Sequence, residues 1–339
     1  KDGIRLLRAV RLAKILGFTI DNITQLSIRE CANMLVDVSP ERVRDEFLEL
    51  FRLKGAKKTL DCLDDLGLLC NIIPELEALR DVEQAGEHYW DVFEHTKQTV
   101  EAVDEVTTAS GHDISVTDTL YWGPDMDSYF GEVVSDGYDR RVMLRLGALF
   151  HDIAKPQTKT VDHNDKTRFL GHPKLGSLMA QNRLKLMRVG SRGIKEVCTM
   201  VEHHLRPTQM SHNLSTPTNR SVFRFYRDLG DSVYSVLYLS LADYLAARGP
   251  TLELDDWQRR VELANYVLAQ GRSVVHQEKQ KRILTGEDLI NVFGLEPGPK
   301  FRTILDGLEE ARILGEVNSR EEGFDWVKSA LGQVEKASD

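Results

Sequence analysis

The sequence predicts an all-α fold, and three observations lead to this prediction. Apolar residues recur every three or four positions in nearly every periodic segment, which is helical spacing. No segment sustains the two-residue alternation of a half-buried strand, and no internal repeat is visible. Glycine and proline stand at the ends of the periodic segments, as at helix boundaries. A length of 339 residues further predicts two or three domains.

The first predicted domain, residues 1–85, contains three helices. Leu6, Val10, Ala13 and Leu16 form the apolar stripe of the first helix, and Gly17 occupies the position after its end. The pair Ser39-Pro40 opens the second helix, with a capping residue followed by proline in the first turn. This helix continues to about residue 55. The third helix follows at once and ends before Pro74.

The second predicted domain, residues 86–250, begins with a long helix over 89–107. Residues 108–140 are acidic, contain glycine and lack periodicity, so we expect a long surface insertion. Helices resume at Arg141 and continue to about residue 248. The stretch RGPTLELDDWQRR marks the next boundary. The third predicted domain, 251–339, is a helical module with a GLEPGPK turn at 294–300.

Charge and composition exclude several classes of protein. A net charge of −9 gives no global basic field, so contact with RNA would have to rest on a local basic strip. Four scattered cysteines without CxxC spacing predict a reducing, cytoplasmic environment. The longest apolar stretch, VYSVLYLSLADYLAA, is too short to span a membrane. Because the chain starts with Lys1 inside a helical pattern, we expect the later part of a longer polypeptide.

Metal-ligating residue types interrupt several apolar helical faces. The stretch LRLGALFHDIAKP, 144–156, places His151 and Asp152 together with Lys155 three positions on. The other candidate ligands are His95, His172, His203, His204 and Asp243. A single histidine on such a face is more often a hydrogen-bonded core residue. A buried carboxylate, however, requires a cation or a network of donors. Imidazole with carboxylate favours Mn²⁺, Ni²⁺, Fe²⁺, Co²⁺ or Zn²⁺ over Mg²⁺. The remaining histidines lack this context: His88, His112, His163, His212 and His276.

In this order, the set resembles the HD-domain family of metal-dependent phosphohydrolases. The resemblance implies a five-helix core over about residues 88–250 and an enzyme that uses divalent ions to activate water for attack on phosphorus. It makes Asp152 and Lys155 catalytic candidates, with Lys155 balancing charge on the phosphate. Arg206 is a further anion-binding candidate. The metal ligands implied are His95, His151, Asp152, His172, His203, His204 and Asp243.

A second resemblance covers the amino-terminal helices. The segments KDGIRLLRAVRLAKILGF, SPERVRDEFLELF and LDDLGLLCNIIPEL resemble the neck and body of bacterial class II tRNA nucleotidyltransferases and poly(A) polymerases. The family motif implies that Asp2 and Arg5 pair with the base edge of CTP or ATP, and that Arg42 lies near the same cleft. Arg8 and Arg11 extend a basic strip toward triphosphate or RNA, although a solvated basic face is the simpler interpretation of these arginines alone.

The tail, residues 282–327, resembles the carboxyl-terminal module of tRNA nucleotidyltransferases that carry an HD domain. Its Pro-Gly-Pro turn is a candidate RNA contact or a plain connection between helices. The family's catalytic head requires a Gly-Ser turn and a DxD pair for Mg²⁺. Asp125-Met126-Asp127 spells DxD without that turn, and we interpret it as coincidence. We therefore expect a head that is cut away or supplied by another chain.

Two functions follow as hypotheses. In the first, the chain is the RNA-binding body and HD phosphohydrolase of a tRNA nucleotidyltransferase. It would bind the 3′ end of tRNA or another RNA, and CTP or ATP through the head, during CCA or A addition. In the second, it is an independent HD phosphohydrolase that acts on nucleotides or cyclic phosphodiesters. A metal-free HD scaffold for RNA is a third possibility. The native metal, the hydrolytic substrate and the oligomeric state are left open.

Overall fold

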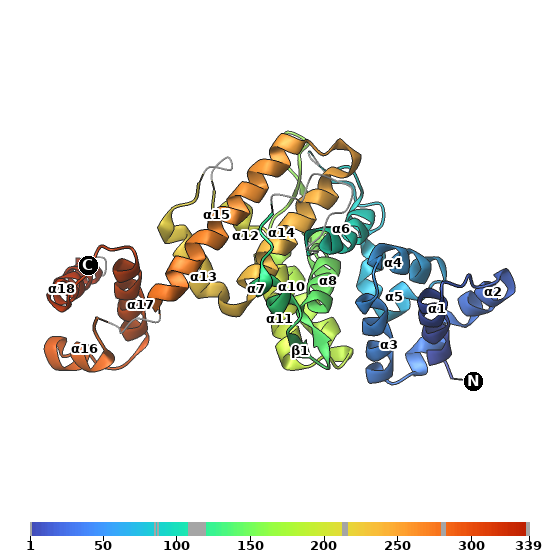
Figure 1. Cartoon of the computed structure of the whole chain (residues 1–339), viewed down its shortest axis with the longest axis horizontal. Coiled ribbons are helices and arrows are strands. Elements are labelled where there is room, and N and C mark those ends of the chain that lie inside the picture. Colours follow the sequence, from blue (N-terminus) through green and yellow to red (C-terminus); the bar gives the residue numbers. More distant parts are fainter. Residues whose placement is uncertain are drawn as a thin grey trace. The chain divides into compact units, whose positions relative to one another are not determined.

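The computed structural model describes residues 2–84, 86, 88–107, 120–211, 216–278 and 283–336, without the side chains of 272–278 and 333–336. Over these residues the predicted all-α class is confirmed, and two small antiparallel sheets of two strands each accompany the helices (Figure 1). The chain forms two compact units. The first comprises residues 1–209 and 231–264, and the second comprises 210–230 and 265–339. These two units do not coincide with the three predicted domains, whose boundaries remain predictions.

The first unit begins with a cluster of short helices, in place of the three predicted ones. In order they are α1 (Ile4–Leu16), α2 (Asn22–Cys31), the 3-10 helix η1 (Ala32–Asp37), α3 (Pro40–Arg52), α4 (Ala56–Asp65), α5 (Leu69–Ile72) and the 3-10 helix η2 (Pro74–Leu79). Helix α1 ends at Gly17 as predicted, in the left-handed conformation with φ 66°. Helix α3 begins after Ser39 as predicted, but the Ser39 side chain makes no capping hydrogen bond.

The buried face of α1 differs from the predicted stripe. Ile4, Leu7 and Val10 are the buried residues of this helix, whereas Leu16 is 56% exposed. Of the predicted stripe, Val10 is confirmed, Leu6 and Ala13 are half-buried, and the prediction is wrong for Leu16. Helix α1 carries two apolar stripes of similar quality, and packing against α3 selects the one that contains Leu7.

The central helices form the core of the first unit. They are α6 (Val92–Val106), α8 (Arg140–Phe150), α10 (His172–Leu186), α11 (Ser191–His203) and α14 (Val233–Arg248). Helix α14 packs along α6, and α8 lies against α6 and α11. Nearly every residue of α8 and α14 is buried. Helix α14 is accordingly apolar on almost all sides, whereas α8 buries Arg140 and Arg145 among its apolar residues. Aspartate caps open two of them: Asp91 accepts from Glu94 N at 2.7 Å, and Asp139 accepts from Val142 N at 3.0 Å.

The expectation of an irregular surface insertion over 108–140 is wrong for its second half. Residues 108–119 lie outside the described part, but 120–140 fold into α7 (Pro124–Phe130) and the hairpin β1 (Val133–Ser135) and β2 (Tyr138–Asp139). Met126 and Phe130 are fully buried, and Trp122 stacks on Phe130 with ring centroids 5.6 Å apart. Aromatic anchors spaced irregularly bury this segment without producing a helical period.

A second hairpin and several short elements complete the first unit. Strands β3 (Lys159–Val161) and β4 (Thr167–Phe169) pair with Thr160 opposite Arg168. Strands of three residues are too short to show alternation in the sequence, and this explains why none was predicted. The short elements are α9 (Lys155–Thr158), α12 (Arg206–Gln209) and the 3-10 helices η4 (Gly230–Ser232) and η5 (Gly249–Thr251). Helix α15 (Leu254–Glu278) continues from the first unit into the second.

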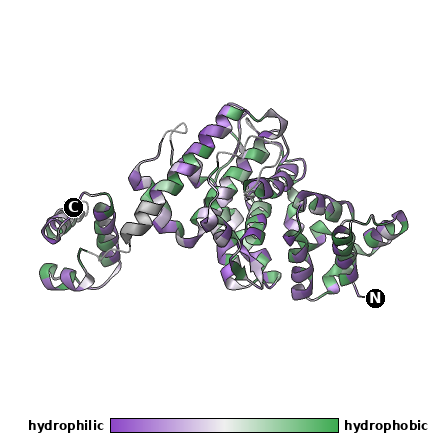
Figure 2. Cartoon of the chain, in the orientation of Figure 1, coloured by the Kyte–Doolittle hydropathy of each residue, from purple (hydrophilic) through white to green (hydrophobic). Residues whose placement is uncertain are grey.

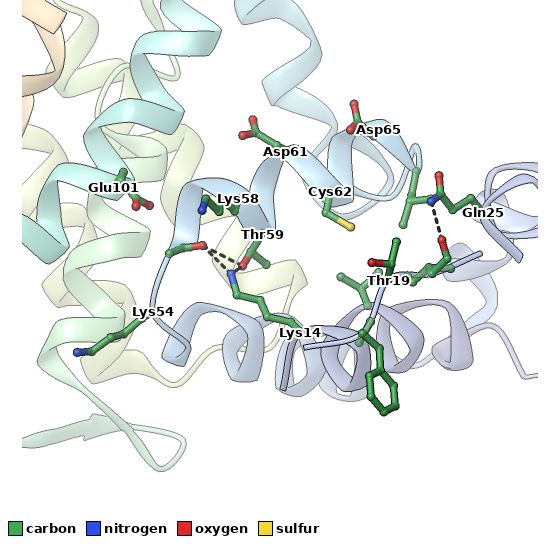
Figure 3. A pocket seen from close by; sticks show the side chains of 16 residues that line it. Lys14, Thr19, Gln25, Lys54, Lys58, Thr59, Asp61, Cys62, Asp65 and Glu101 are labelled. Atoms are coloured by element: carbon green, nitrogen blue, oxygen red, sulfur yellow. Dashed lines mark hydrogen bonds between the residues drawn. The ribbon is translucent and has the colours of Figure 1, made fainter. Parts of the chain in front are cut away.

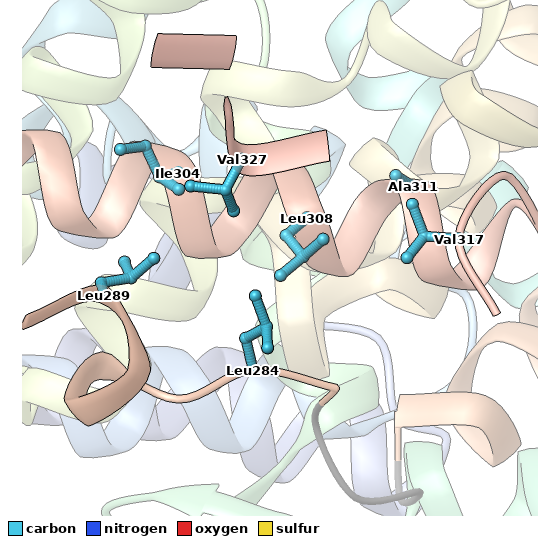
Figure 4. Close-up of a cluster of buried hydrophobic side chains, with 7 residues drawn as sticks. All are labelled: Leu284, Leu289, Ile304, Leu308, Ala311, Val317 and Val327. Carbon is cyan, nitrogen blue, oxygen red and sulfur yellow. The ribbon is translucent and has the colours of Figure 1, made fainter. Parts of the chain in front are cut away.

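The second unit contains α13 (Asn219–Leu229), α16 (Gly286–Phe293), α17 (Pro299–Ile313) and α18 (Arg320–Lys336). Buried residues from the carboxyl-terminal helices and the segments between them form its core (Figure 4): Leu284, Leu289, Ile304, Leu308, Ala311, Val317 and Val327. The predicted Pro-Gly-Pro turn connects α16 and α17, and Pro299 is the first residue of α17. Arg224 of α13 binds the buried Glu310 of α17 at 2.9 Å.

Hydrophobic and hydrophilic residues share most helices (Figure 2), as expected for helices that bury one face against a neighbour. Within the described residues, no helix combines the length and the apolar character needed to cross a membrane.

Candidate metal centre

The packed helices of the first unit bring most of the predicted metal ligands to one place. His95 lies on α6, and His151 caps the end of α8 with Asp152 directly after it. His172 is the first residue of α10, and His204 follows the end of α11. The side chains of these five residues are buried. Asp243, on α14, lies against two of them with 19% of its side chain exposed.

One potential ligand group consists of His95, His151 and Asp152. The Nε2 atoms of the two histidines are 3.2 Å apart. Oδ2 of Asp152 lies 3.1 Å from His151 Nε2 and 3.5 Å from His95 Nε2. Oδ1 of Asp243 completes the group, because it lies 3.0 Å from His95 Nε2 and 3.6 Å from His151 Nε2.

A second potential group consists of Asp152, His172 and His204. The other carboxylate oxygen of Asp152, Oδ1, lies 3.3 Å from His172 Nε2 and 3.9 Å from His204 Nε2. The Nε2 atoms of these two histidines are 3.4 Å apart. Asp152 therefore turns one oxygen toward each histidine pair, which is the arrangement of a carboxylate that bridges two cations.

The hydrogen bonds of the rings leave the Nε2 atoms available as ligands. Nδ1 of His151 lies 2.7 Å from the carbonyl oxygen of Ala148, and Nδ1 of His204 lies 2.8 Å from that of Val201. His172 Nδ1 lies 2.7 Å from the carbonyl oxygen of Phe169. A carbonyl only accepts hydrogen bonds, so each Nδ1 carries the proton and donates. In the neutral ring the lone pair is then on Nε2, which faces Asp152.

The buried carboxylate at the centre lacks ordinary hydrogen bonds. Both oxygens of Asp152 are inaccessible and accept no hydrogen bond of standard geometry, and Nδ1 of His95 has no partner either. Lys155 Nζ lies 2.6 Å from Asp152 Oδ2 and is the nearest fixed positive charge. Burying a carboxylate is costly; Lys155 offsets part of this cost at Oδ2, and a cation held between the carboxylate and the imidazoles would offset more of it. The residues present therefore fit divalent metal ions.

The electrostatics keep most of these groups in ligand form. Burial raises the pKa of the Asp152 carboxyl, but His151 and Lys155 lower it by a larger amount. The pKa is therefore well below its usual value. Burial lowers the pKa of His204 to about 4 and also lowers the pKa of His95. His151 behaves differently. Burial lowers its pKa, but the carboxylates of Asp152 and Asp243 outweigh burial and raise the pKa to about 10.

Two neighbours of the centre were not predicted. Lys155 Nζ also donates to Oε1 of Gln84. The ring of His88 lies edge-on against His95, with centroids 5.4 Å apart, and burial lowers the pKa of His88 to about 4. The sequence gives no helical signal for His88, because this residue lies before the start of α6 at Val92. Residues 85 and 87 lie outside the described part.

Some of the histidines and other site residues considered in the sequence do not join either ligand group. His203 is half-buried, and among the described residues it belongs to neither ligand group. Arg206 is the first residue of α12, two positions beyond His204. Of the histidines set aside, His163 is exposed near the turn of the β3–β4 hairpin. His112, His212 and the side chain of His276 lie outside the described part of the chain.

The amino-terminal strip is held by ion pairs that the sequence did not predict. Asp2 Oδ2 binds Arg42 Nη2 at 2.5 Å, and Arg5 is exposed. Glu46 of α3 accepts from Arg8 Nε at 2.8 Å and from Arg11 Nε at 2.7 Å. The two arginines remain 49% and 25% exposed at their side chains. The strip is thus an ordered basic edge.

Comparison with known proteins identifies the family. Residues 17–79 match the family described as "Probable RNA and SrmB- binding site of polymerase A", and residues 92–248, which include both ligand groups, match the HD domain. The chain is 30% identical over 340 residues to the A-adding tRNA nucleotidyltransferase of Deinococcus radiodurans, covering 96% of this chain and 68% of the relative. The chain belongs to the tRNA nucleotidyltransferase/poly(A) polymerase family.

Other members of the tRNA nucleotidyltransferase/poly(A) polymerase family are similar over the same extent. The CC-adding tRNA nucleotidyltransferase of Thermus thermophilus is 29% identical, over 95% of this chain and 65% of the relative. A crystal structure of the Bacillus stearothermophilus CCA-adding enzyme in complex with CTP aligns with a TM-score of 0.54 at 17% identity, over 99% of this chain and 63% of that one. The Thermotoga maritima CCA-adding enzyme complexed with tRNA gives 0.50 at 16%, over 97% and 61%. The chain therefore spans about two thirds of the length of its relatives.

Proposed function

We propose that this family member provides the RNA-binding body and a metal-dependent phosphohydrolase site of a tRNA nucleotidyltransferase. One observation carries the hydrolase half of the proposal. The two oxygens of a single buried carboxylate, Asp152, face two different histidine pairs. Such a site suits a pair of divalent ions, and imidazole-rich ligands favour Mn²⁺, Ni²⁺, Fe²⁺, Co²⁺ or Zn²⁺ over Mg²⁺.

The residues of the centre have distinct roles in this proposal. His95, His151 and Asp243 would hold one ion, His172 and His204 the other, and Asp152 both. Bound divalent ions polarise a phosphoryl oxygen and make a water molecule a better nucleophile. Lys155 holds its ammonium group beside Asp152 and would balance the negative charge of a phosphate at the site. The backbone carbonyls of Ala148, Phe169 and Val201 keep three rings oriented.

The amino-terminal edge would bind nucleotide and RNA. Asp2 and Arg5 would recognise the base edge of CTP or ATP, with Arg42 in a structural role near the same cleft, and Arg8 and Arg11 would contact phosphate. Glu46 supports this role, because it holds the two arginines side by side and leaves part of each guanidinium exposed. The 3′ end of tRNA is the proposed RNA, with A or CCA addition carried out together with a Mg²⁺-dependent head. Arg206 is a further candidate for RNA contact.

Two variants, one at each proposed site, test the proposal when both activities are measured in each. Asp152→Ala should abolish hydrolysis and metal binding and leave tRNA affinity nearly intact. Arg8→Ala should weaken tRNA binding and leave hydrolysis unchanged. Hydrolysis is measured with phosphatase and phosphodiester substrates in Mn²⁺, Ni²⁺ and Mg²⁺, and RNA binding by fluorescence anisotropy. Equal loss of both activities in both variants, with normal circular dichroism spectra, would contradict two separate sites.

The second candidate is an independent HD phosphohydrolase that acts on nucleotides or cyclic phosphodiesters. It is favoured by the two ligand groups around Asp152, which do not involve the amino-terminal strip. Rapid turnover of small nucleotides without measurable tRNA affinity would support this candidate. A chain that binds RNA but retains no metal after Mn²⁺ loading and dialysis would instead support the scaffold alternative.

A further inference from the structure

The first unit contains a pocket that is lined by none of the candidate metal ligands. It is a pocket of about 690 Å³ lined by residues of α1, α2, α4 and α6 and by the segment 18–20 (Figure 3). Its apolar lining includes Val10, Ala13, Phe18 and Leu66. Volumes of 300–1,000 Å³ are typical of pockets that hold small organic ligands. The pocket is therefore large enough for one nucleotide.

The lysines that line the pocket differ in whether they have partners. Lys14 is engaged, because its Nζ donates to the carbonyl oxygen of Gly55 at 2.6 Å and to the hydroxyl of Thr59 (Figure 3). Lys54 and Lys58 are exposed and form no ion pair among the residues described. Two lysines that form no direct ion pair among the described residues therefore lie beside a ligand-sized pocket.

Two of the three lining carboxylates already have partners. Asp61 binds Lys57 at 2.8 Å and Lys97 at 2.7 Å. Glu101 Oε2 accepts the backbone N–H of Lys57 at 2.9 Å. The third carboxylate, Asp65, and the amide of Gln25 lie on the opposite side of the view from Lys54 (Figure 3). Lys54 and Lys58 lie toward one side of the pocket together with Glu101, whose carboxylate already accepts a backbone N–H, and Asp65 and Gln25 lie toward the other (Figure 3).

We propose that this pocket binds one unpaired nucleotide of an RNA. Lys54 and Lys58 contact its phosphate, and the base enters the apolar part and stacks on Phe18, whose ring is 69% exposed. Gln25 and Asp65 contact the base edge. The inference rests on the RNA binding proposed above and adds a subsite to it. Most of the lining lies within residues 17–79, which match the RNA-binding family region.

A protein segment is the competing occupant. Apolar side chains of α1 and α2 are exposed, among them Ile15, Leu16 and Ile23, and such side chains often mark protein interfaces. The unpaired lysines and the ligand-sized volume favour the nucleotide, because a polyanion needs cations and a segment docked on these helices does not.

Anisotropy measurements with two RNAs test the subsite. One RNA is a hairpin with an unpaired 3′ extension, and the other is the same hairpin with a blunt end. The double variant Lys54→Gln/Lys58→Gln and the single variant Phe18→Ala should each bind the extended hairpin about tenfold more weakly, and the blunt hairpin unchanged. The double variant should also lower the salt-dependence slope by about 0.7, since each neutralised phosphate of a single strand contributes about 0.7.

The control replaces two exposed lysines of the β3–β4 hairpin, as Lys159→Gln/Lys166→Gln, and should bind both RNAs like the wild type. Wild-type affinity of the pocket variants for the extended RNA would overturn the subsite and leave the proposed RNA binding in place. If the wild-type chain binds neither RNA, the proposed RNA binding fails, and the subsite fails with it.

A reversible block at Cys62, which also lines the pocket, provides a second measurement. The variant Cys31→Ser/Cys70→Ser/Cys198→Ser keeps this cysteine alone. Burial raises the pKa of the Cys62 thiol, so labelling is done at alkaline pH with a small methanethiosulfonate. The extended RNA should slow labelling several-fold, and the label should weaken RNA binding until a reductant removes it. Labelling that is unaffected by bound RNA would overturn the inference and favour a protein segment.

Discussion

The Nε2 atoms of His95 and His151 lie 3.2 Å apart, although 56 positions separate the two residues in the sequence. Nδ1 of His151 donates to a backbone carbonyl, so in the neutral ring its Nε2 carries a lone pair. Burial lowers the pKa of His151, but the carboxylates of Asp152 and Asp243 raise it to about 10, so this ring carries a proton on the Nε2 that faces His95. Helices α6 and α8 hold this arrangement in a buried environment, where a divalent ion would take the place of that proton.

The division of ligands around Asp152 predicts how metal stoichiometry changes. The wild-type chain should bind close to two Mn²⁺ ions. His95→Ala and His172→Ala should each lower this to about one ion, because each removes a ligand of a different group. Asp152→Ala should remove both, since its oxygens serve the two groups. Isothermal titration with Mn²⁺ measures the stoichiometry. A wild-type chain that binds only one ion, with both histidine variants losing that ion, would contradict a two-ion centre.

The adjacent histidines of α11 provide a matched pair of variants. His204 is buried and lies 3.4 Å from His172 Nε2, whereas His203 belongs to neither ligand group of the described residues. His204→Ala should weaken binding of one ion by at least tenfold, and His203→Ala should change it less than twofold. Metal affinity is measured by competition with a fluorescent chelator. If His203→Ala proves the more damaging change, the ligand set is assigned wrongly.

Lys155 is expected to act on hydrolysis more than on metal binding. Replacement by Gln removes the ammonium beside Asp152 and should lower kcat about 10²- to 10³-fold, the usual effect of losing one charge-stabilising group. Metal stoichiometry should persist, because the histidines and carboxylates remain. The exposed neighbour variant Lys159→Gln is the control. A Lys155→Gln protein that keeps wild-type kcat in steady-state assays would exclude a catalytic role for this residue.

Glu46 should make stability depend on pH. Burial raises the pKa of its carboxyl, but Arg11 and Arg8 lower it more, so the folded-state pKa lies below the ordinary value of 4.5. The ionised form therefore stabilises the fold at pH values above 4.5, and this contribution is lost as pH falls through the folded-state pKa. At pH 7, Glu46→Gln should lower the free energy of unfolding by about 1–3 kcal/mol.

Denaturant unfolding of the wild type and of Glu46→Gln at several pH values measures this difference, which should shrink below pH 4.5. Glu49→Gln, on the same helix but half-exposed, should cost less than about 1 kcal/mol, as exposed pairs do. A difference that stays constant down to pH 3 would show that packing, and not the charge of Glu46, is responsible.

Two helix boundaries followed from the sequence, because capping and turn signals are local. Gly17 ends α1 in the left-handed conformation, and α3 starts after Ser39-Pro40, as predicted. Residues 120–140 were misjudged, because irregularly spaced side chains such as Met126 and Phe130 bury that segment by contacts with distant helices.

The sequence by itself determined the helical class, the family and the residue types of the metal centre, since periodicity, motif order and ligand chemistry are all properties of local sequence. Only the tertiary structure decided that Asp152 faces both histidine pairs, that His204 rather than His203 joins them, and that Arg42 rather than Arg5 pairs with Asp2. These choices depend on distances of a few ångströms between residues tens of positions apart, and such distances arise from helix packing and side-chain rotamers that no local pattern specifies.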